Sequence, residues 1–244
     1  MKRHKSVLQL YVRSSFHWLI AVCVLLAGAE FFWFRHTFQK LLRQYEAGEI
    51  FVLLPERVVE MAHLEYFFLA ALALVMVILL LNGRNISSKQ EYTLYRLGIQ
   101  QKYVFLWQAI YGSLSYLLLW AVQVAAAVGL CMYFVKTADS SMMTNQTLFL
   151  AFCRNEFLSF VLPVHNVLGG VAHISMYLAL GWSVAYETYC HRRGKRSFWL
   201  WIVVGVGYAA VAGGATASLF FFVLAIGVIS FFTLKEGEWT LDGE

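Results

Sequence analysis

The sequence predicts an all-α integral membrane protein with about six transmembrane helices. Hydrophobic residues make up 60% of the 244 residues and charged residues only 14%, whereas about 25% of the residues in soluble proteins are charged. The hydrophobic residues gather in long runs, and a run of about 20 apolar residues crosses the roughly 30 Å hydrocarbon core of a bilayer. We therefore expect residues 1–244 to form a single transmembrane domain surrounded by membrane lipid.

Six apolar runs predict the transmembrane helices. The last two are separated only by Gly213, Gly214 and Ala215, which indicates a tight helical hairpin. Pairs of small residues at Gly169-Gly170 and Gly205-x-Gly207 predict positions where helices approach closely. The predicted spans are approximately residues 16–34, 64–81, 103–134, 161–186, 198–212 and 216–234.

The cations indicate the orientation of these spans. Thirteen of the 19 Lys and Arg residues fall on one side, namely in the N-terminal tail, in residues 82–102, after Tyr186 and in the C-terminal tail. Because cytoplasmic loops carry an excess of Lys and Arg, we expect both termini to lie in the cytoplasm. Apolar and polar residues alternate from Met1 to Ser15, which predicts an amphipathic N-terminal helix at the membrane interface.

The second external loop changes character along its length. It begins polar after Lys136 and becomes apolar with interspersed charge from Leu148 to Leu162. This pattern favours an interfacial segment that leads into the fourth span, and a re-entrant segment that ends before Pro163 is the alternative.

Few side chains inside the spans indicate chemistry. The sequence contains no H-E-x-x-H, G-x-S-x-G or P-loop motif, so we predict no catalytic, cofactor or metal site and no ATP binding by this chain. Glu30 is the one acid well inside an apolar run, and it is a candidate functional group unless it pairs with Arg35. His165 and His173 lie eight residues apart; interfacial hydrogen bonding is the favoured role, and a haem or metal pair is the alternative. The positions of the cations follow the membrane topology, so we expect no nucleic-acid partner.

Residues 87–98 predict a short amphipathic helix on the cytoplasmic side. Ser87 or Ser88 provides a cap with Glu91 three or four residues later, and Gly98 provides a stop before the next span. Such a helix, joined directly to two spans, is able to transmit a push from a cytoplasmic partner; a connector without a partner is the alternative. The residues that define this helix are Lys89, Glu91, Tyr92, Tyr95, Arg96, Leu97 and Gly98.

This segment resembles the short cytoplasmic helix of ABC-2 type ABC transporter permeases. The resemblance rests on Glu91, Leu94, Arg96, Leu97 and Gly98, followed by Lys102, Val104 and Gln108 at the start of the next span. The stretch from Glu91 to Gly98 also resembles the related E-x-x-x-x-R-x-L-G stretch of FtsX-like permeases, but the chain has no large external domain of the kind found in that class. The six predicted spans and the interfacial N-terminal helix are similar to the ABC-2 permeases over the whole chain.

The resemblance implies a permease subunit in a bacterial plasma membrane. A separate cytoplasmic ABC ATPase would dock on residues 89–98, with Glu91 and Arg96 as polar contacts and Tyr92, Tyr95 and Leu97 as apolar contacts. A second permease subunit, the same or a different chain, would complete the pathway. Few charges lie in the spans, which favours export of an amphiphilic or hydrophobic substrate. The alternatives are a membrane scaffold or sensor subunit and a histidine-dependent integral membrane enzyme.

Overall fold

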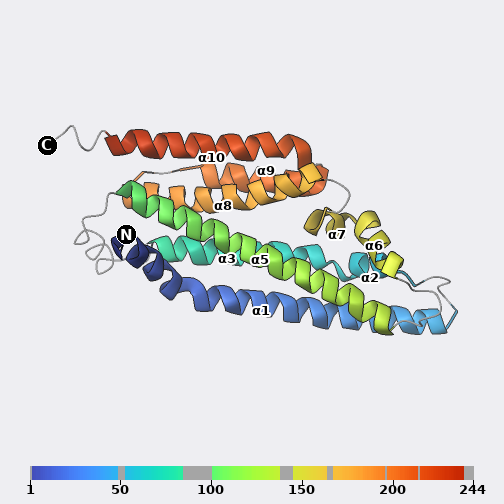
Figure 1. The fold of residues 1–244 in the computed structure, drawn as a ribbon. Coiled ribbons are helices and arrows are strands. Elements are labelled where there is room, and N and C mark those ends of the chain that lie inside the picture. Colours follow the sequence, from blue (N-terminus) through green and yellow to red (C-terminus); the bar gives the residue numbers. More distant parts are fainter. Residues whose placement is uncertain are drawn as a thin grey trace. The chain divides into compact units, whose positions relative to one another are not determined.

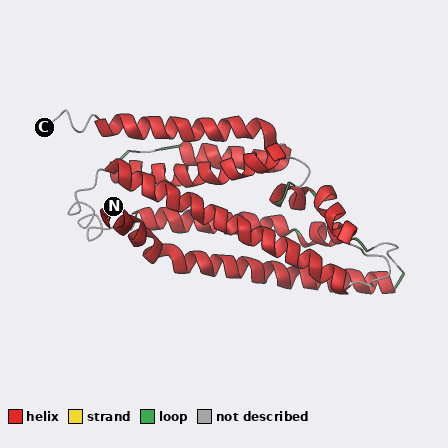
Figure 2. Cartoon of the chain, viewed as in Figure 1, coloured by secondary structure: helices red, strands yellow, loops and turns green. Residues whose placement is uncertain are grey.

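A computed structural model of the chain describes residues 2–48, 53–84, 101–137, 145–163, 167–195, 197–213 and 215–238. Within these ranges the protein is entirely helical and contains no strand (Figure 2). The helices, labelled in Figure 1, are α1 (Lys2–Glu46), α2 (Pro55–Ala62), α3 (Leu64–Arg84), α5 (Gln101–Thr137), α6 (Asn145–Arg154), α7 (Glu156–Val161), α8 (Val167–Arg192), α9 (Trp199–Gly213) and α10 (Ala215–Glu238).

Four helices have the length and the apolar composition of membrane-spanning helices. They are Leu8–Glu46 of α1, Leu64–Gly83 of α3, Gln101–Thr137 of α5 and Val167–Arg192 of α8. The all-helical prediction is therefore confirmed for the described residues, and four of the six predicted spans correspond to such helices. The last two predicted spans correspond to α9, of 15 residues, and α10, of 24 residues; in α10, Phe221–Thr233 forms a shorter apolar stretch.

Two expected boundaries differ from the structure. The amphipathic segment expected before the first span is continuous with it, because α1 runs as one helix from Lys2 to Glu46. The fourth span was expected to begin at Val161, but Val161 is the last residue of the short helix α7, and α8 begins at Val167. Proline at position 163 explains the difference, because its ring cannot continue the preceding helix.

The chain divides into two compact units. Unit 1 contains residues 1–20, 74–118 and 171–244, and unit 2 contains residues 21–73 and 119–170. In unit 1, α9 and α10 form the expected hairpin, and they lie side by side in Figure 1. An apolar cluster there joins Phe105 and Ala109 of α5 to Ala185, Tyr189 and other residues of α8.

Unit 2 has its own apolar core. Phe34, Phe38 and Leu41 recur along α1 at helical spacing and pack with Leu130 and Phe134 of α5. The rings of Phe38 and Phe134 meet edge to face with centroids 5.2 Å apart, an arrangement that adds about 0.5–1.5 kcal/mol to the burial of the two rings.

Three short helices cover the end of this core. Asn155 caps α7, because its Oδ1 accepts a hydrogen bond of 3.0 Å from the Leu158 amide. Its Nδ2 also donates to the Glu56 carbonyl of α2 over 3.3 Å. The indole Nε1 of Trp120 donates to the Val161 carbonyl at the end of α7 over 2.9 Å. Both alternatives for this loop, interfacial and re-entrant, agree with a helical segment that packs on α5.

Candidate functional site

The predicted docking helix lies outside the described residues. This applies to Lys89, Glu91, Tyr92, Tyr95, Arg96, Leu97 and Gly98, so their role stays a prediction. The structure does describe both flanks of the segment, namely the end of α3 at residues 82–84 and the start of α5 from Gln101. The candidate site is therefore built from these flanks and from the helices of unit 1 that contact them.

Gly83 brings the end of α3 against α5 and α8. A Cβ atom at this position would lie 2.7 Å from Gln108 Nε2 and 2.8 Å from Thr188 Cβ, and closer still to Thr188 Cγ2. Contacts below 3.0 Å are too short for real carbon atoms, so a side chain at position 83 would displace its neighbours. The absence of a side chain at Gly83 therefore permits this approach of the three helices.

Gln108 of α5 is the centre of a buried hydrogen-bond network. Its Nε2 donates to Thr188 Oγ1 over 2.5 Å, and its Oε1 accepts from Arg192 Nη2 over 2.5 Å. The same Oε1 accepts a longer bond of 3.5 Å from the Tyr11 hydroxyl. Gln108, Tyr11 and Thr188 are all buried, so these bonds satisfy polar groups that would be costly to leave without partners. The network joins α1, α5 and α8.

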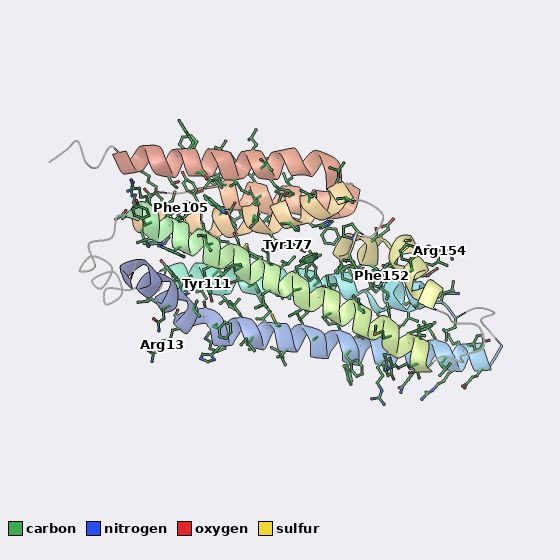
Figure 3. The ribbon with its side chains drawn as sticks, viewed as in Figure 1. Arg13, Phe105, Tyr111, Phe152, Arg154 and Tyr177 are labelled. Carbon is green, nitrogen blue, oxygen red and sulfur yellow. The ribbon has the colours of Figure 1, made fainter. Side chains whose placement is uncertain are left out.

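A second set of bonds fastens the end of α3 to α1. Asn82 Nδ2 donates to Ser15 Oγ over 3.2 Å, and Asn82 Oδ1 accepts from the Ser14 hydroxyl. Ser15 Oγ also lies 2.7 Å from the hydroxyl of Tyr111, a residue of α5 that Figure 3 labels. Three residues before the undescribed segment, the chain is thus bonded to α1, and Ser15 links α1 in turn to α5.

The far flank of the segment is bonded to the end of α8. Arg193 donates to Gln101 Oε1 through Nε and Nη2, over 3.3 and 3.2 Å. Its guanidinium carbon lies 4.4 Å above the centre of the Tyr189 ring, within the range of a cation–π interaction. Gln101 is the first described residue after the segment, so α5 begins in contact with α8.

The local sequence fixes where α8 ends. Gly194 adopts a φ of +69°, its amide donates to the His191 carbonyl, and the Lys195 amide donates to the Cys190 carbonyl. This is a Schellman motif, in which glycine accepts the left-handed conformation that other residues resist. The motif ends α8 at Arg192. Gly194 therefore has a structural role at the end of α8.

Sequence reasoning found part of this arrangement. It identified the segment and named Gln108 as part of the motif, but it did not identify Tyr11, Asn82, Gly83 or Thr188 as partners. A polar residue at the end of an apolar run was the available signal, because such side chains commonly find partners on neighbouring helices. Which helix supplies the partner depends on tertiary packing, which no single span reveals.

Glu30 belongs to unit 2, and its partner is not Arg35, the cation considered from the sequence. Its Oε1 accepts a hydrogen bond of 2.8 Å from Gln123 Nε2 of α5, and both side chains are fully buried. The ion pairs of the described residues are His63–Glu65 and Arg154–Glu56, so the alternative pairing of Glu30 with Arg35 is not formed there. Figure 3 labels Arg154 at the end of α6.

The histidine alternative receives no geometric support from the described residues. His173 is buried in α8, and His165 lies outside the described ranges. Among the residues that the structure describes, no group of three or more His, Cys, Asp or Glu side chains is arranged to hold a metal ion.

The fold defines the chain as a helical protein with four helices suited to cross a membrane. Comparison with models of protein families, with curated proteins and with solved structures found no match to this chain.

Proposed function

We propose that this chain is the multi-pass permease subunit of an ABC transporter in a bacterial plasma membrane. In this proposal α9 and α10 supply the fifth and sixth spans, and both termini lie in the cytoplasm. ATP is hydrolysed by a separate subunit that docks on residues 89–98, and a second permease subunit completes the pathway. The chain itself is then no enzyme.

One observation supports the proposal most directly. Both flanks of the predicted docking segment are bonded to other helices of unit 1, through Asn82 to α1 and through Gln101 and Gln108 to α8. The displacement of a docking helix has to reach helices beyond the two spans that it connects, because it must reach the transport pathway. Here a displacement of residues 85–100 would be carried into α1, α3, α5 and α8 together.

The contacts of Gln108 are suited to this task because Gln108 and its partner Thr188 are buried. A hydrogen bond to a charged group is stronger than a neutral one, and the Arg192–Gln108 bond is of this kind. The burial of Gln108 limits competition from water. We therefore expect the four helix ends to respond to a force together, which supports a docking site for an ATPase.

The composition supports an amphiphilic or hydrophobic cargo. Of the side chains in the four candidate spans that are buried, Glu30 is the one acid in the described residues. A pathway for ions or sugars would need more polar groups facing one another within the spans. We therefore propose export of lipids, hydrophobic peptides or amphiphilic compounds. Transport of a labelled sugar but of no amphiphile would contradict this part of the proposal.

The first test is co-purification of an ATPase. Tagged full-length protein is purified from its native membrane in mild detergent, together with the double variant Tyr95→Ala/Arg96→Glu. We expect a nucleotide-binding subunit and ATPase activity with the unaltered protein and neither with the double variant. The matched control is Lys136→Glu, which reverses an exposed cation at the opposite end of α5 and is expected to retain the ATPase.

A third variant separates docking from transmission. Gln108→Leu removes the bonds to Thr188 and Arg192 without altering residues 89–98, so we expect it to retain the ATPase but to lose its stimulation by substrate. If the unaltered protein carries no ATPase under conditions that preserve a known transporter complex, the permease proposal is wrong.

A further inference from the structure

Glu30 of α1 and Gln123 of α5 form an isolated polar pair within unit 2. Their single hydrogen bond, from Gln123 Nε2 to Glu30 Oε1, measures 2.8 Å. Buried apolar residues lie one helical turn away on both sides, namely Leu26 and Phe34 on α1 and Leu119 and Ala127 on α5. The pair is thus enclosed by apolar side chains of its own two helices.

Each partner has one oxygen atom left over. Glu30 Oε2 and Gln123 Oε1 are both buried and have no hydrogen-bond partner among the described residues. Buried polar atoms almost always have partners, and an ionised carboxylate in apolar surroundings is especially costly. Because both remaining atoms are oxygens, an ionised Glu30 leaves two acceptors and no donor between them.

The missing partner is therefore a hydrogen-bond donor, and it must be small. The pair is fully buried, so it offers no opening to a larger ligand. A hard metal cation requires about six oxygen ligands, and the pair supplies two oxygens without partners. A single proton meets both requirements, because a hydroxyl at Oε2 donates while the carboxyl loses its charge.

We propose that Glu30 carries a proton on Oε2 and donates it to Gln123 Oε1. The carboxylic acid and the amide then form a closed ring of two hydrogen bonds, with each group donating once and accepting once. The proton comes from water before the pair is buried, and it cancels the one negative charge of the carboxylate. The ring gives both orphaned oxygens a partner and fastens α1 to α5 within unit 2 without a net charge.

This inference is independent of the proposed function. A transporter subunit, a scaffold or a sensor would each contain such a pair, because it follows from the two helices and from the donor count alone. A failure of this inference would therefore leave the outcome of the ATPase experiment unaffected. A failure of the ATPase experiment would likewise leave this inference unaffected.

Infrared spectroscopy of the purified full-length protein at neutral pH tests the proton directly. A carboxylic acid has a C=O stretching band that a carboxylate lacks, and the band shifts in D2O. We expect this band in the difference spectrum between the unaltered protein and Glu30→Gln. The matched control is Glu56→Gln, which removes an acid that forms an ion pair at 3.6 Å and is expected to leave the band unchanged.

Two further variants keep the test decisive if Glu30→Gln fails to fold. Gln123→Leu retains the acid but removes its amide partner, so the band should move to higher frequency. The exchange Glu30→Gln/Gln123→Glu restores an acid–amide pair and should restore the band. A spectrum of the unaltered protein with no acid band that depends on Glu30, or a band that Gln123→Leu leaves in place, would overturn the proposal.

Discussion

The contact between α5 and α8 leads to a sharp prediction for Gly181. A Cβ atom at this position would lie 2.6 Å from Ser113 Cα and closer still to the Ser113 amide nitrogen and Oγ. Two of these three atoms belong to the backbone of α5, so no side-chain rotation relieves the clash. Gly181→Ala can be accommodated only if the two helices move apart.

The size of the effect follows from a comparison with a second glycine. Gly205 of α9 has no atom within 4 Å of its added Cβ, so Gly205→Ala changes helix propensity without overpacking. Alanine is favoured over glycine in helices by about 1 kcal/mol, and this gain is common to both variants. Their difference therefore reports overpacking alone, which typically costs about 1–3 kcal/mol.

Thermal unfolding in detergent measures this difference. For a chain of 150–250 residues, 1 kcal/mol corresponds to about 2–4 °C in Tm. We expect Gly181→Ala to unfold about 2–12 °C below Gly205→Ala. Equal Tm values for the two variants would show that α5 and α8 are not in backbone contact at this position, and the rigid-body argument for unit 1 would lose its basis.

Three further predictions use the same assay. Gln108→Leu removes the partner of Arg192 and Thr188, and stability should fall by about 1–3 kcal/mol because buried polar groups lose their bonds; an unchanged Tm would contradict the network. Gln123→Leu should cost a similar amount, because it leaves the Glu30 carboxyl without its donor, whereas Glu30→Gln should cost less since the amide retains a partner. Asn155→Ala should lower the free energy of unfolding by about 1 kcal/mol, because the cap of α7 is lost. The neighbouring Arg154→Ala should lower it by about 0–1 kcal/mol, because this arginine is exposed. A larger loss for Arg154→Ala than for Asn155→Ala would refute this ranking.

The helices were largely predictable because hydrophobic runs are long and local. The apolar run from Leu64 to Leu81 corresponds to α3, and the hairpin of α9 and α10 was also expected. The start of α8 was placed too early, at Val161, because apolar composition continues through the boundary that Pro163 marks. Hydropathy measures which residues tolerate lipid, and it does not register where the backbone hydrogen bonds stop.

The close helix contacts could not be ranked from the sequence. Gly205 and Gly207 were expected to permit close approach in a packed bundle or a dimer. Within the described chain Gly205 faces open space and Gly207 has only ordinary contact with Met176, so an approach by a second subunit stays a prediction. The tight contacts occur at Gly83 and Gly181 instead. A small residue permits close approach on one helix face, but a close contact forms only where another helix packs against that face.

Glu30 illustrates the same limit for polar groups. Its nearest cation in the sequence is Arg35, and a local pairing was the natural alternative. The structure gives it Gln123, which lies 93 residues away in the chain. Arg35 is exposed, whereas the amide of Gln123 is fully buried beside Glu30, so pairing satisfies two polar groups that would otherwise be costly to bury.

The arrangement of unit 1 also limits how a docking force can spread. Gly181 lets α8 approach the backbone of α5 at Ser113, and Gly83 lets the end of α3 approach the side chains of Thr188 and Gln108. Gln108 adds bonds in which every partner is buried or half-buried. Packed contacts resist compression, and directional bonds resist sliding. With both kinds present, and under the proposed function, we expect α8 to move together with α3 and α5 when an ATPase displaces residues 85–100. Substitution of Gln108 should therefore impair transmission even where the glycine contacts keep the helices together, and a variant with normal substrate-stimulated ATPase would show that packing alone suffices.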